Sequence, residues 1–544
     1  MNKEIIYISD FFVEDVLGGG ELNDREILSM LRGAKYSVEK IQSHCVTNEF
    51  LLSRKEHFFI ISNFINLNSS CREILIDLEY VIYEHDHKYM KSRNPALHEN
   101  FKAKTKDIIN YHFYKNAKAV FCQSKLHKSI IEKNLIGLNN IISVGGNLWS
   151  LATLENIRKY LKIQKQDTCA ILRSNTEHKN TIGAIRFCTH KNMKYNLIAS
   201  SNYDDFLLSM AKNKKFVFLP KTPETLSRVV VEARMLGLSV TTNNLVGATG
   251  EEWFNKKGEE LIDYMIQKRE EIFSLIIDVL ERPVKIKKKP LISIIATFYE
   301  AEKYLHGFFE TITNQTIFDE CELIIVDSNS PGNEQKIVES YCSKYDNIKY
   351  YRFKKRFSPT VGFNLALMNS SGKYYSWAMI DDRKSLDSLE VLYRELKSNQ
   401  DVDLVYGDCL VTDIENEKLD ETKSKIISEH SSYPFTRENM IKCLPGPMPM
   451  WTRRMIESVG FFNQDEYDFS DDWEMWLRCV DNNFKFKKVD KVIGLYLAGG
   501  RSQADNNISQ RKEEVKLFFK YGHIFGDNYA KYYSYFNNLK GNLI

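Results

Sequence analysis

The chain has 544 residues, more than one ordinary hydrophobic core accommodates, so two to four domains are expected. Its 75 Lys and Arg against 72 Asp and Glu leave a net charge of +3, which excludes the global positive excess typical of proteins that hold nucleic acid mainly through phosphates. The 10 cysteines form no CxxC pair, which favours reduced thiols in a cytoplasmic protein over a zinc site.

Neither a signal peptide nor a membrane-spanning segment is expected. The N-terminus runs directly into a strand-like pattern, without a basic segment, an apolar stretch and a cleavage site. The most apolar stretch, residues 273–280, is interrupted by Asp278 and is too short to cross a bilayer. We therefore expect a cytoplasmic protein whose contact with a membrane, if any, is peripheral.

The first half of the chain alternates short apolar runs with longer stretches of helical periodicity. This alternation predicts an α/β fold with parallel sheets and crossover helices. The predicted strands cover residues 4–9, 58–62, 80–83, 119–122, 141–144, 170–172, 196–199 and 216–219. A break at 145–147 divides residues 1–283 into two Rossmann-like lobes, about 1–147 and 148–283, with a nucleotide expected in the cleft between them.

Two motifs in this half suggest a ligand site. A Gly-rich turn, Leu17-Gly-Gly-Gly-Glu-Leu22, follows the first strand and opens a helix, so Gly19 and Gly20 would let a diphosphate approach helix-terminal N–H groups. Further on, Glu224 and Glu232 are eight residues apart, about two helical turns. Taken alone, the two glutamates also fit an ordinary solvated helix face.

Together with Ala117-Lys-Ala-Val-Phe-Cys-Gln-Ser124 and His178-Lys179-Asn180, these motifs resemble glycosyltransferase family 4, which has the two-lobed GT-B fold, needs no metal and usually retains anomeric configuration. The resemblance implies a set of contacts to a nucleotide-sugar donor: Gly19 and Gly20 to phosphate, Arg173 and Lys179 to the diphosphate, Glu224 to the sugar, Glu232 to the ribose hydroxyls and His85 to the transferred sugar. Thr225-Leu226-Ser227 replaces the family's Gly-Phe-Gly, so a non-catalytic binding module is the alternative.

Residues 284–290 are predicted to be an interdomain linker. Two prolines, Pro283 and Pro290, bracket four lysines between a helical pattern and a buried strand. A run of like charge is usually solvated, so we interpret the lysines as a connector.

A second α/β unit follows over residues 291–502, with predicted strands at 291–296, 323–326 and 374–380 and a helical, aromatic-rich tail at 503–544. Asp327 follows the second of these strands and Asp381-Asp382 the third, at the strand ends where ligands bind in open α/β sheets. Carboxylates there suit Mn²⁺ or Mg²⁺ shared with a nucleotide diphosphate.

A third acidic pair, Asp471-Asp472, begins a helical stretch that continues Trp473-Glu-Met-Trp-Leu-Arg478. Acids at a helix N-terminus are favoured by the macrodipole. A carboxylate in such a place can act as a general base on a hydroxyl that lies within hydrogen-bond reach. An Asp-Asp pair on its own is more often a turn or a helix cap.

With Ile292-Ser-Ile-Ile-Ala-Thr-Phe-Tyr-Glu300, Asn314-Gln-Thr316, Gly362-Phe-Asn-Leu-Ala366 and Gly372-Lys-Tyr-Tyr375, these acidic motifs resemble glycosyltransferase family 2, with the GT-A fold. The resemblance implies an inverting, metal-dependent hexosyl- or pentosyltransferase with these roles: Asp327 a nucleoside contact, Asp381 a ribose or metal contact, Asp382 the metal ligand, and Asp472 the catalytic base with Asp471 beside it.

The sequence departs from that family at three places. Ser328 stands where many members have an Asp that reads uracil, so thymine is an open alternative. Asp471 replaces the commoner Glu. The late segment Leu495-Tyr-Leu-Ala-Gly-Gly-Arg-Ser502 lacks the family's His, and Arg501 is a candidate contact to the diphosphate.

The two resemblances together imply a tandem, bifunctional glycosyltransferase, GT-B-like and then GT-A. The implied partners are nucleotide-sugar donors and a glycan or lipid-linked oligosaccharide acceptor of surface-polysaccharide synthesis. An alternative acceptor is a hydroxymethylated base in phage DNA, held flipped out of the duplex. The small net charge counts against this alternative.

Overall fold

The computed structural model describes residues 4–200, 202–283, 289–499 and 508–543. By internal contacts the chain divides into two compact units, one of Met1–Ala103 with Asn110–Lys285 and the other of Lys104–Ile109 with Ile286–Ile544. No helix in the described part of the chain combines the length and the apolar character needed to cross a membrane.

The first unit contains two fully parallel sheets, which confirms the α/β prediction for this half. The six-stranded sheet has the order β2-β1-β3-β4-β5-β6 and the four-stranded sheet the order β10-β9-β7-β8. The strands are β1 (Ile5–Ser9), β2 (Val38–Gln42), β3 (Phe58–Ile61), β4 (Glu79–Glu84), β5 (Val120–Cys122), β6 (Ile141–Ser143), β7 (Gln166–Leu172), β8 (Tyr195–Ile198), β9 (Asn213–Val217) and β10 (Ser239–Thr241).

The α-helices of the first unit lie between these strands along the chain. They are α1 (Gly19–Gly33), α2 (Asn48–Leu52), α3 (Ser69–Leu75), α4 (Tyr111–Asn116), α5 (Lys125–Asn134), α6 (Leu151–Tyr160), α7 (Thr181–His190), α8 (Tyr203–Ala211), α9 (Arg228–Met235) and α10 (Glu259–Glu281).

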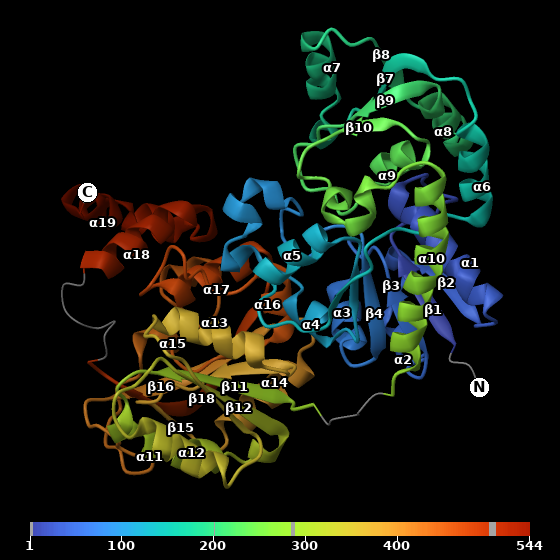
Figure 1. Ribbon diagram of the computed structural model, residues 1–544. Helices are drawn as coiled ribbons and strands as arrows, with labels where there is room; N and C mark the ends of the chain where they lie inside the picture. The colour runs from blue at the N-terminus through green and yellow to red at the C-terminus, as the bar shows by residue number, and fades with distance from the viewer. Residues whose placement is uncertain (1–3, 201, 284–288, 500–507, 544) are drawn as a thin grey trace. The chain divides into compact units, whose positions relative to one another are not determined.

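Helix α10 packs against the cores of both sheets (Figure 1). Its first half contributes Leu261 and Met265 to the core of the four-stranded sheet. Its second half contributes Ile272 and Ile276 to the core of the six-stranded sheet. One amphipathic helix therefore joins the two lobes of the first unit.

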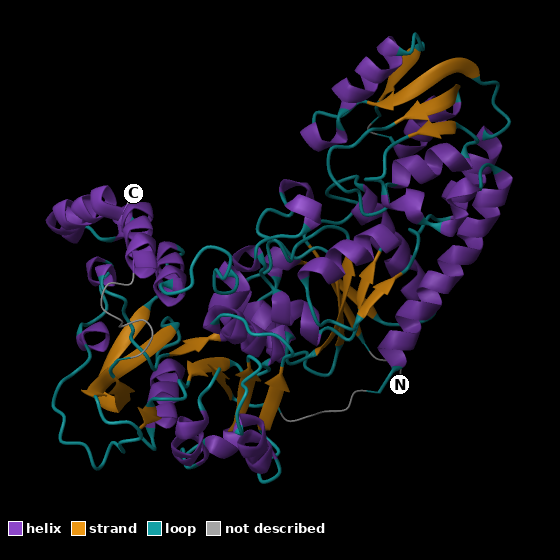
Figure 2. Ribbon diagram, turned by 60° about the vertical axis from the view of Figure 1, so that its left-hand side comes forward, coloured by secondary structure: helices purple, strands orange, loops and turns teal. Residues whose placement is uncertain are grey.

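The second unit is built on one mixed eight-stranded sheet of order β13-β12-β11-β14-β17-β16-β18-β15, with helices flanking its strands (Figure 2). Strands β13, β12, β11 and β14 are parallel, while β17 pairs antiparallel with β14 and with β16. The strands are β11 (Ile292–Phe298), β12 (Cys321–Asp327), β13 (Ile348–Arg352), β14 (Tyr374–Trp377), β15 (Arg383–Lys384), β16 (Leu404–Thr412), β17 (Met450–Thr452) and β18 (Phe486–Leu497).

The α-helices of the second unit are α11 (Glu302–Thr313), α12 (Glu334–Cys342), α13 (Pro359–Asn369), α14 (Ser388–Ser398), α15 (Glu429–Ser432), α16 (Arg453–Val459), α17 (Asp471–Asp481), α18 (Ile508–Lys520) and α19 (Asp527–Leu543). The tail after the sheet is helical, and Phe518 stacks on Phe525 and Phe536 within it. These aromatic side chains pack against one another, as expected for the tail.

Two local expectations were wrong. The strand predicted to reach residue 380 ends at Trp377, and the chain leaves the sheet after the amide of Ala378 has bonded to Ile295. Glu224 and Glu232 do not share a helix, because α9 begins only at Arg228, after Ser227 adopts a φ of 74°. A positive φ at a residue other than Gly interrupts the right-handed helix.

Candidate functional site

Parallel strands bring two of the predicted acidic motifs to one edge of the second unit's sheet. β11 pairs with β12 on one side and with β14 on the other, and all three run in the same direction. Asp327 ends β12, and Asp381 and Asp382 follow β14. They therefore lie at the carboxyl end of the sheet, where open α/β folds bind ligands.

Helix α13 connects the carboxyl end of this sheet to the third acidic pair, Asp471 and Asp472. Its Gly362 lies so close to Thr297, near the end of β11, that no side chain would fit there. Thr360, two residues earlier on α13, is near enough to Asp471 for its hydroxyl to lower the pKa of that carboxyl. The start of α17, which carries Asp471, thus approaches the same edge of the sheet.

Asp471 and Asp472 form the first turn of α17. One carboxylate oxygen of Asp472 accepts the backbone N–H of Trp473 at 2.6 Å, and the other accepts the Cys443 thiol at 3.4 Å. The indole of Trp473 donates to the carbonyl of Met440 at 2.7 Å, which holds this turn against the segment before Cys443. Asp472 is therefore fixed by donors on both oxygens.

The two carboxyls differ in acidity. Burial and the neighbouring Asp472 raise the pKa of Asp471 to about 7. Burial also raises the pKa of Asp472, but the Trp473 amide, the Cys443 thiol and the positive potential of His430 oppose it. Two adjacent carboxyl groups titrate together, and hydrogen-bond donors stabilise the carboxylate form of the group that they contact. These donors therefore favour the ionised form of Asp472, whereas burial and the neighbouring charge oppose ionisation of Asp471.

Asp382 is 5% exposed and has one unsatisfied oxygen. Its Oδ1 accepts the backbone N–H of Leu497 at 3.0 Å, whereas its Oδ2 has no hydrogen-bond partner within the described ranges. Burial, followed by the charge of Asp381, raises the pKa of Asp382 well above its ordinary value. A buried carboxylate oxygen without a partner is costly, and a cation bound there would remove that cost.

The side chains around Asp382 decide whether a divalent cation fits at this place. No group of three or more His, Cys, Asp or Glu side chains gathers around one point in residues 4–200, 202–283, 289–499 and 508–543. Asp381 and Asp382 alone would supply only part of a coordination shell, which would suit Mg²⁺ or Mn²⁺ held jointly with substrate phosphates. The donor set fits a substrate-completed site and does not fit a closed protein cage.

Asp327 is fully buried and already has three partners. Its Oδ1 accepts the amide of Ser330 at 2.7 Å, while its Oδ2 accepts the Tyr350 hydroxyl at 2.6 Å and Arg352 at 2.8 Å. Both new partners come from the edge strand β13. Ser328 exchanges hydrogen bonds with the backbone of Phe357, so its hydroxyl holds the neighbouring loop. Arg501 lies outside the described residues.

The Gly-rich turn of the first unit begins α1 beside two side chains of other elements. A methyl group at Gly19 would lie 3.2 Å from Cδ of Arg228, and one at Gly20 would lie 3.5 Å from Cγ of His85. His85 is held by Asp24 through Nε2 at 2.9 Å and by Gln123 through Nδ1 at 2.7 Å. The imidazole therefore has a fixed orientation at the N-terminus of α1.

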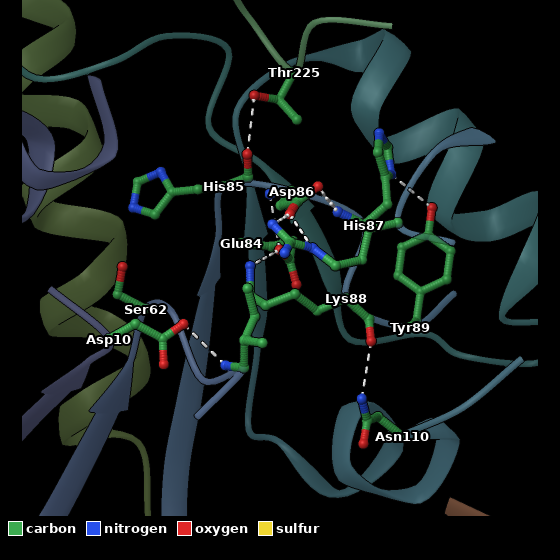
Figure 3. Close-up of polar contacts among 12 residues, drawn as sticks. Asp10, Ser62, Glu84, His85, Asp86, His87, Lys88, Tyr89, Asn110 and Thr225 are labelled. Carbon is green, nitrogen blue, oxygen red and sulfur yellow. Dashed lines mark hydrogen bonds and ion pairs between the residues drawn. The ribbon is translucent and has the colours of Figure 1, made fainter. Parts of the chain in front are cut away.

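The segment after β4 is held by contacts from several elements (Figure 3). The backbone oxygen of His85 accepts the Thr225 hydroxyl at 3.4 Å, and that of Lys88 accepts the Asn110 amide at 2.8 Å. Glu84 and Lys88 form a buried ion pair. Thr225 comes from the second lobe, so this segment is one place where the lobes of the first unit meet.

The remaining residues predicted for the first unit fall into three environments. Both oxygens of Glu224 accept Lys179 at 2.9 Å. Glu232 is 2% exposed and accepts the Trp149 indole at 3.0 Å and the Tyr203 hydroxyl. Arg173 is exposed. The two glutamates are thus engaged with protein groups and are not on a solvated helix face.

Sequence reasoning missed several residues that contact the predicted ones. They are Cys443 at Asp472, Tyr350 and Arg352 at Asp327, and Arg228 beside the Gly-rich turn. Each lies more than 20 residues from its partner along the chain, and no local pattern marks it.

Comparison with known proteins finds similar sequences for the second unit. Residues 293–459 match the sequence family described as "Glycosyl transferase family 2". An uncharacterized glycosyltransferase of Methanocaldococcus jannaschii is 26% identical over 236 residues, covering 43% of this chain and 78% of that protein. The cholesterol galactosyltransferase of Borreliella burgdorferi is 26% identical over 230 residues (41% and 60%), and the chondroitin synthase of Escherichia coli 22% over 257 residues (47% and 34%). For these last two, the chain spans less than two thirds of the relative.

Two solved structures are similar at lower identity. TarS of S. aureus, residues 1–349, matches with 15% identity and a TM-score of 0.36, covering 45% of this chain and 72% of that one. A mannosyltransferase of Pyrobaculum calidifontis, in complex with GDP-Man and Mn²⁺, matches with 18% identity and a TM-score of 0.34, covering 44% and 68%.

Proposed function

We propose that this chain, whose second half carries a family 2 glycosyltransferase domain, transfers a sugar from a nucleotide-diphosphate donor to a hydroxyl group during glycan synthesis. The observation that carries the proposal is the acid pair of α17. Asp472 has a donor on each oxygen, and these donors favour its ionised form, whereas the pKa of Asp471 is raised to about 7. An ionised, oriented carboxylate at a ligand-binding edge is what general-base catalysis needs.

In the proposed reaction, Asp472 accepts the proton of the acceptor hydroxyl. The freed oxygen forms a bond to the anomeric carbon while the bond from that carbon to the diphosphate oxygen breaks, and the nucleoside diphosphate leaves with the bonding electrons. Attack from the face opposite the leaving group inverts the anomeric configuration. A carboxylate base in hydrogen-bond contact contributes about 10²–10⁴-fold to such a step.

Asp381 and Asp382 are the proposed holders of the divalent cation. The unsatisfied Oδ2 of Asp382 supports this assignment. When bound, Mn²⁺ or Mg²⁺ would neutralise charge on the departing diphosphate. Asp327 is the proposed nucleoside contact, with its carboxylate held in place by Tyr350 and Arg352. Arg501 remains a proposed diphosphate contact.

The proposed donor is a nucleotide-activated hexose or pentose, and the proposed acceptor is a glycan or a lipid-linked oligosaccharide. The Escherichia coli relative named as a chondroitin synthase supports a glycan as the acceptor. The proposed location is the cytoplasm, with peripheral contact to a membrane where the acceptor is lipid-linked.

The first unit is proposed as a second, GT-B-like transferase site of family 4 type. Its two parallel sheets, the helix α10 that packs on both, and the Gly19-Gly20 turn between His85 and Arg228 support this assignment. In it, Lys179 and Arg173 would contact diphosphate, Glu224 the sugar and Glu232 the ribose. Two linked sites would pass an intermediate between them at raised effective concentration.

A non-catalytic binding module is the second candidate for the first unit. One observation favours it: Lys179 engages both oxygens of Glu224, and Glu232 is buried under Trp149 and Tyr203. For these glutamates to contact a donor, their present partners would have to be exchanged. A sugar donor would drive that exchange only if its hydroxyl groups bound the freed glutamates more strongly than Lys179, Trp149 and Tyr203 do.

A screen of nucleotide sugars with Mn²⁺ or Mg²⁺ tests both assignments. Release of nucleoside diphosphate is measured for wild type, Asp472→Asn and Glu232→Gln. We expect Asp472→Asn to lower turnover of one donor by at least about 10²-fold. If Glu232→Gln instead abolishes turnover of a different donor, the result supports two separate transferase sites. An effect of Asp472→Asn alone supports the binding module, and full activity of Asp472→Asn would refute the base assignment.

A further inference from the structure

The loop that leads into the acid pair is held by one carboxylate of the C-terminal tail. Glu513, on α18, accepts the backbone N–H of Asp468 at 2.9 Å through Oε1. Its Oε2 accepts the N–H of Phe469 at 3.0 Å and that of Ser470 at 2.8 Å. Three consecutive amides immediately before Asp471 thus converge on a single side chain.

Other tail residues contact α17 itself. The Tyr521 hydroxyl donates to Glu474 at 3.0 Å, and Lys520 lies 3.5 Å from the same carboxylate, which is fully buried. Phe525 stacks on Trp473, whose amide binds Asp472. All of these tail residues follow the region that matches the family, 293–459. The tail therefore contacts both the helix and the loop that orient the acid pair.

A carboxylate that accepts three backbone N–H groups restrains the loop that carries them. Hydrogen bonds to an ionised acceptor are short and strongly directional, so three of them fix both the position and the direction of the loop. Helix α17 begins at the next residue, so the position of the loop determines where the carboxyl groups of Asp471 and Asp472 point. A displacement of about 1 Å at a catalytic group costs about 10²-fold in rate, so such a support bears on catalysis.

From this geometry we propose that Glu513 is a positioning residue for Asp472, and that the helical tail is part of the transfer site of the second unit. The inference rests on the proposed role of Asp472 as the base. Among the described residues, the hydrogen bonds of Glu513 go to the backbone of residues 468–470, so we assign its role to the loop and not to contact with the reacting atoms.

The first arm of the test is kinetic and uses the full chain. Glu513→Gln keeps the shape of the side chain but replaces one acceptor oxygen by an NH₂ group. This NH₂ group cannot accept hydrogen bonds from the backbone N–H groups of the loop. We expect kcat to fall about tenfold, with KM for the donor changed less than twofold, because the donor contacts are elsewhere. Lys512→Ala, at the exposed neighbouring position on α18, is the matched control and should keep wild-type kcat.

The second arm needs no activity. Amide hydrogen exchange is followed in peptides that cover residues 466–476 and, as a fold control, in peptides from β11. In Glu513→Gln we expect about tenfold faster exchange at residues 468–470 and unchanged exchange in β11. Unchanged exchange at 468–470, or faster exchange with an unchanged kcat, would overturn the proposal.

The two arms separate this inference from the proposed function. If wild type and Asp472→Asn turn over donors equally, the base assignment fails whatever Glu513 does. If Asp472→Asn is inactive and Glu513→Gln keeps full kcat, only the positioning role fails. If Glu513→Gln loses exchange protection in β11 as well, Glu513 supports the whole domain and the specific role is refuted.

Discussion

The Cys443 thiol donates a hydrogen bond to Oδ2 of Asp472, with sulfur and oxygen 3.4 Å apart. Cys443 precedes the acid pair by 29 residues, and its segment is attached to α17 a second time through the Trp473 indole and Met440. A donor to a carboxylate stabilises the ionised form. This contact therefore helps to keep Asp472 charged in a buried place, where burial alone would favour its neutral form.

We expect Cys443→Ala to raise the pKa of Asp472 and so to move the acidic limb of the kcat/KM profile to higher pH. A hydrogen bond to a charged group contributes about 1.5–3 kcal/mol, and a thiol is a weak donor, so a shift of about half to one pH unit is reasonable. The measurement is kcat/KM between pH 5 and 9. Cys443→Ser restores a donor and should restore the profile, while Cys342→Ala, on α12, serves as the control. An unshifted limb in Cys443→Ala would show that the thiol does not influence the base.

Asp471 should make the protein less stable as pH rises. Its folded pKa of about 7 lies above its ordinary value of 3.8, so the folded state binds more protons between about pH 4 and 7, and stability falls as pH rises through that window. Asp471→Asn removes this loss. We expect the Tm of the variant to exceed that of wild type by more at pH 8 than at pH 5, as measured by thermal unfolding. Asp420→Asn, at an exposed position, should show no such trend, and an equal Tm difference at both pH values would contradict the assignment.

Asp382→Asn should stabilise the protein and reduce its activity at the same time. The substitution replaces a buried carboxyl group whose Oδ2 has no hydrogen-bond partner among the described residues, while the new amide oxygen can still accept the Leu497 N–H. An unsatisfied buried group costs about 1–3 kcal/mol, which corresponds to a rise in Tm of about 2–4 °C per kcal/mol in a domain of this size. We expect a higher Tm without added metal and loss of metal-dependent turnover. A lower Tm would mean that the Asp382 carboxylate is already satisfied, and retained turnover would refute its role as ligand.

The buried strands and the strand-end acids could be predicted from local patterns. Continuous apolar runs mark β3, β5 and β12 because both faces of a parallel strand are buried. Asp327 was found because it ends such a run. The edge strands β2, β10 and β13 were missed because each is partly exposed and interrupted by polar residues, which leaves no apolar run to detect. The interior strands β16, β17 and β18 were also missed, whereas the edge strands β6 and β8 were found.

The supporting contacts of the acid pair could not be predicted. Cys443 and Glu513 reach the start of α17 from 29 and more than 40 residues away, along paths set by the packing of whole elements. The same holds for Glu232, whose burial under Trp149 depends on how α9 meets the segment before α6. A motif identifies a carboxylate, but folding decides which donors surround it and hence whether it is ionised.

Gly20→Ala tests whether the first unit binds a donor. A methyl group at Gly20 would sit 3.5 Å from His85, an ordinary contact, so the fold should be retained, and Ala in place of Gly in a helix is favourable by about 1 kcal/mol. The same methyl group would obstruct a phosphate that approaches the N-terminus of α1. In an Asp472→Asn background, we expect the residual turnover of a donor to fall at least about tenfold, with Tm unchanged or slightly higher.

Gly33→Ala, in the last turn of the same helix, is the matched control, because a methyl group there meets open space. It makes the same change in helix propensity without approaching the predicted phosphate site, so it should leave turnover intact. If Gly20→Ala and Gly33→Ala behave alike while turnover persists, the donor of the first unit does not bind at the Gly-rich turn. If the Asp472→Asn background shows no turnover with any donor, the binding-module alternative holds, because a transferase site in the first unit would act independently of Asp472.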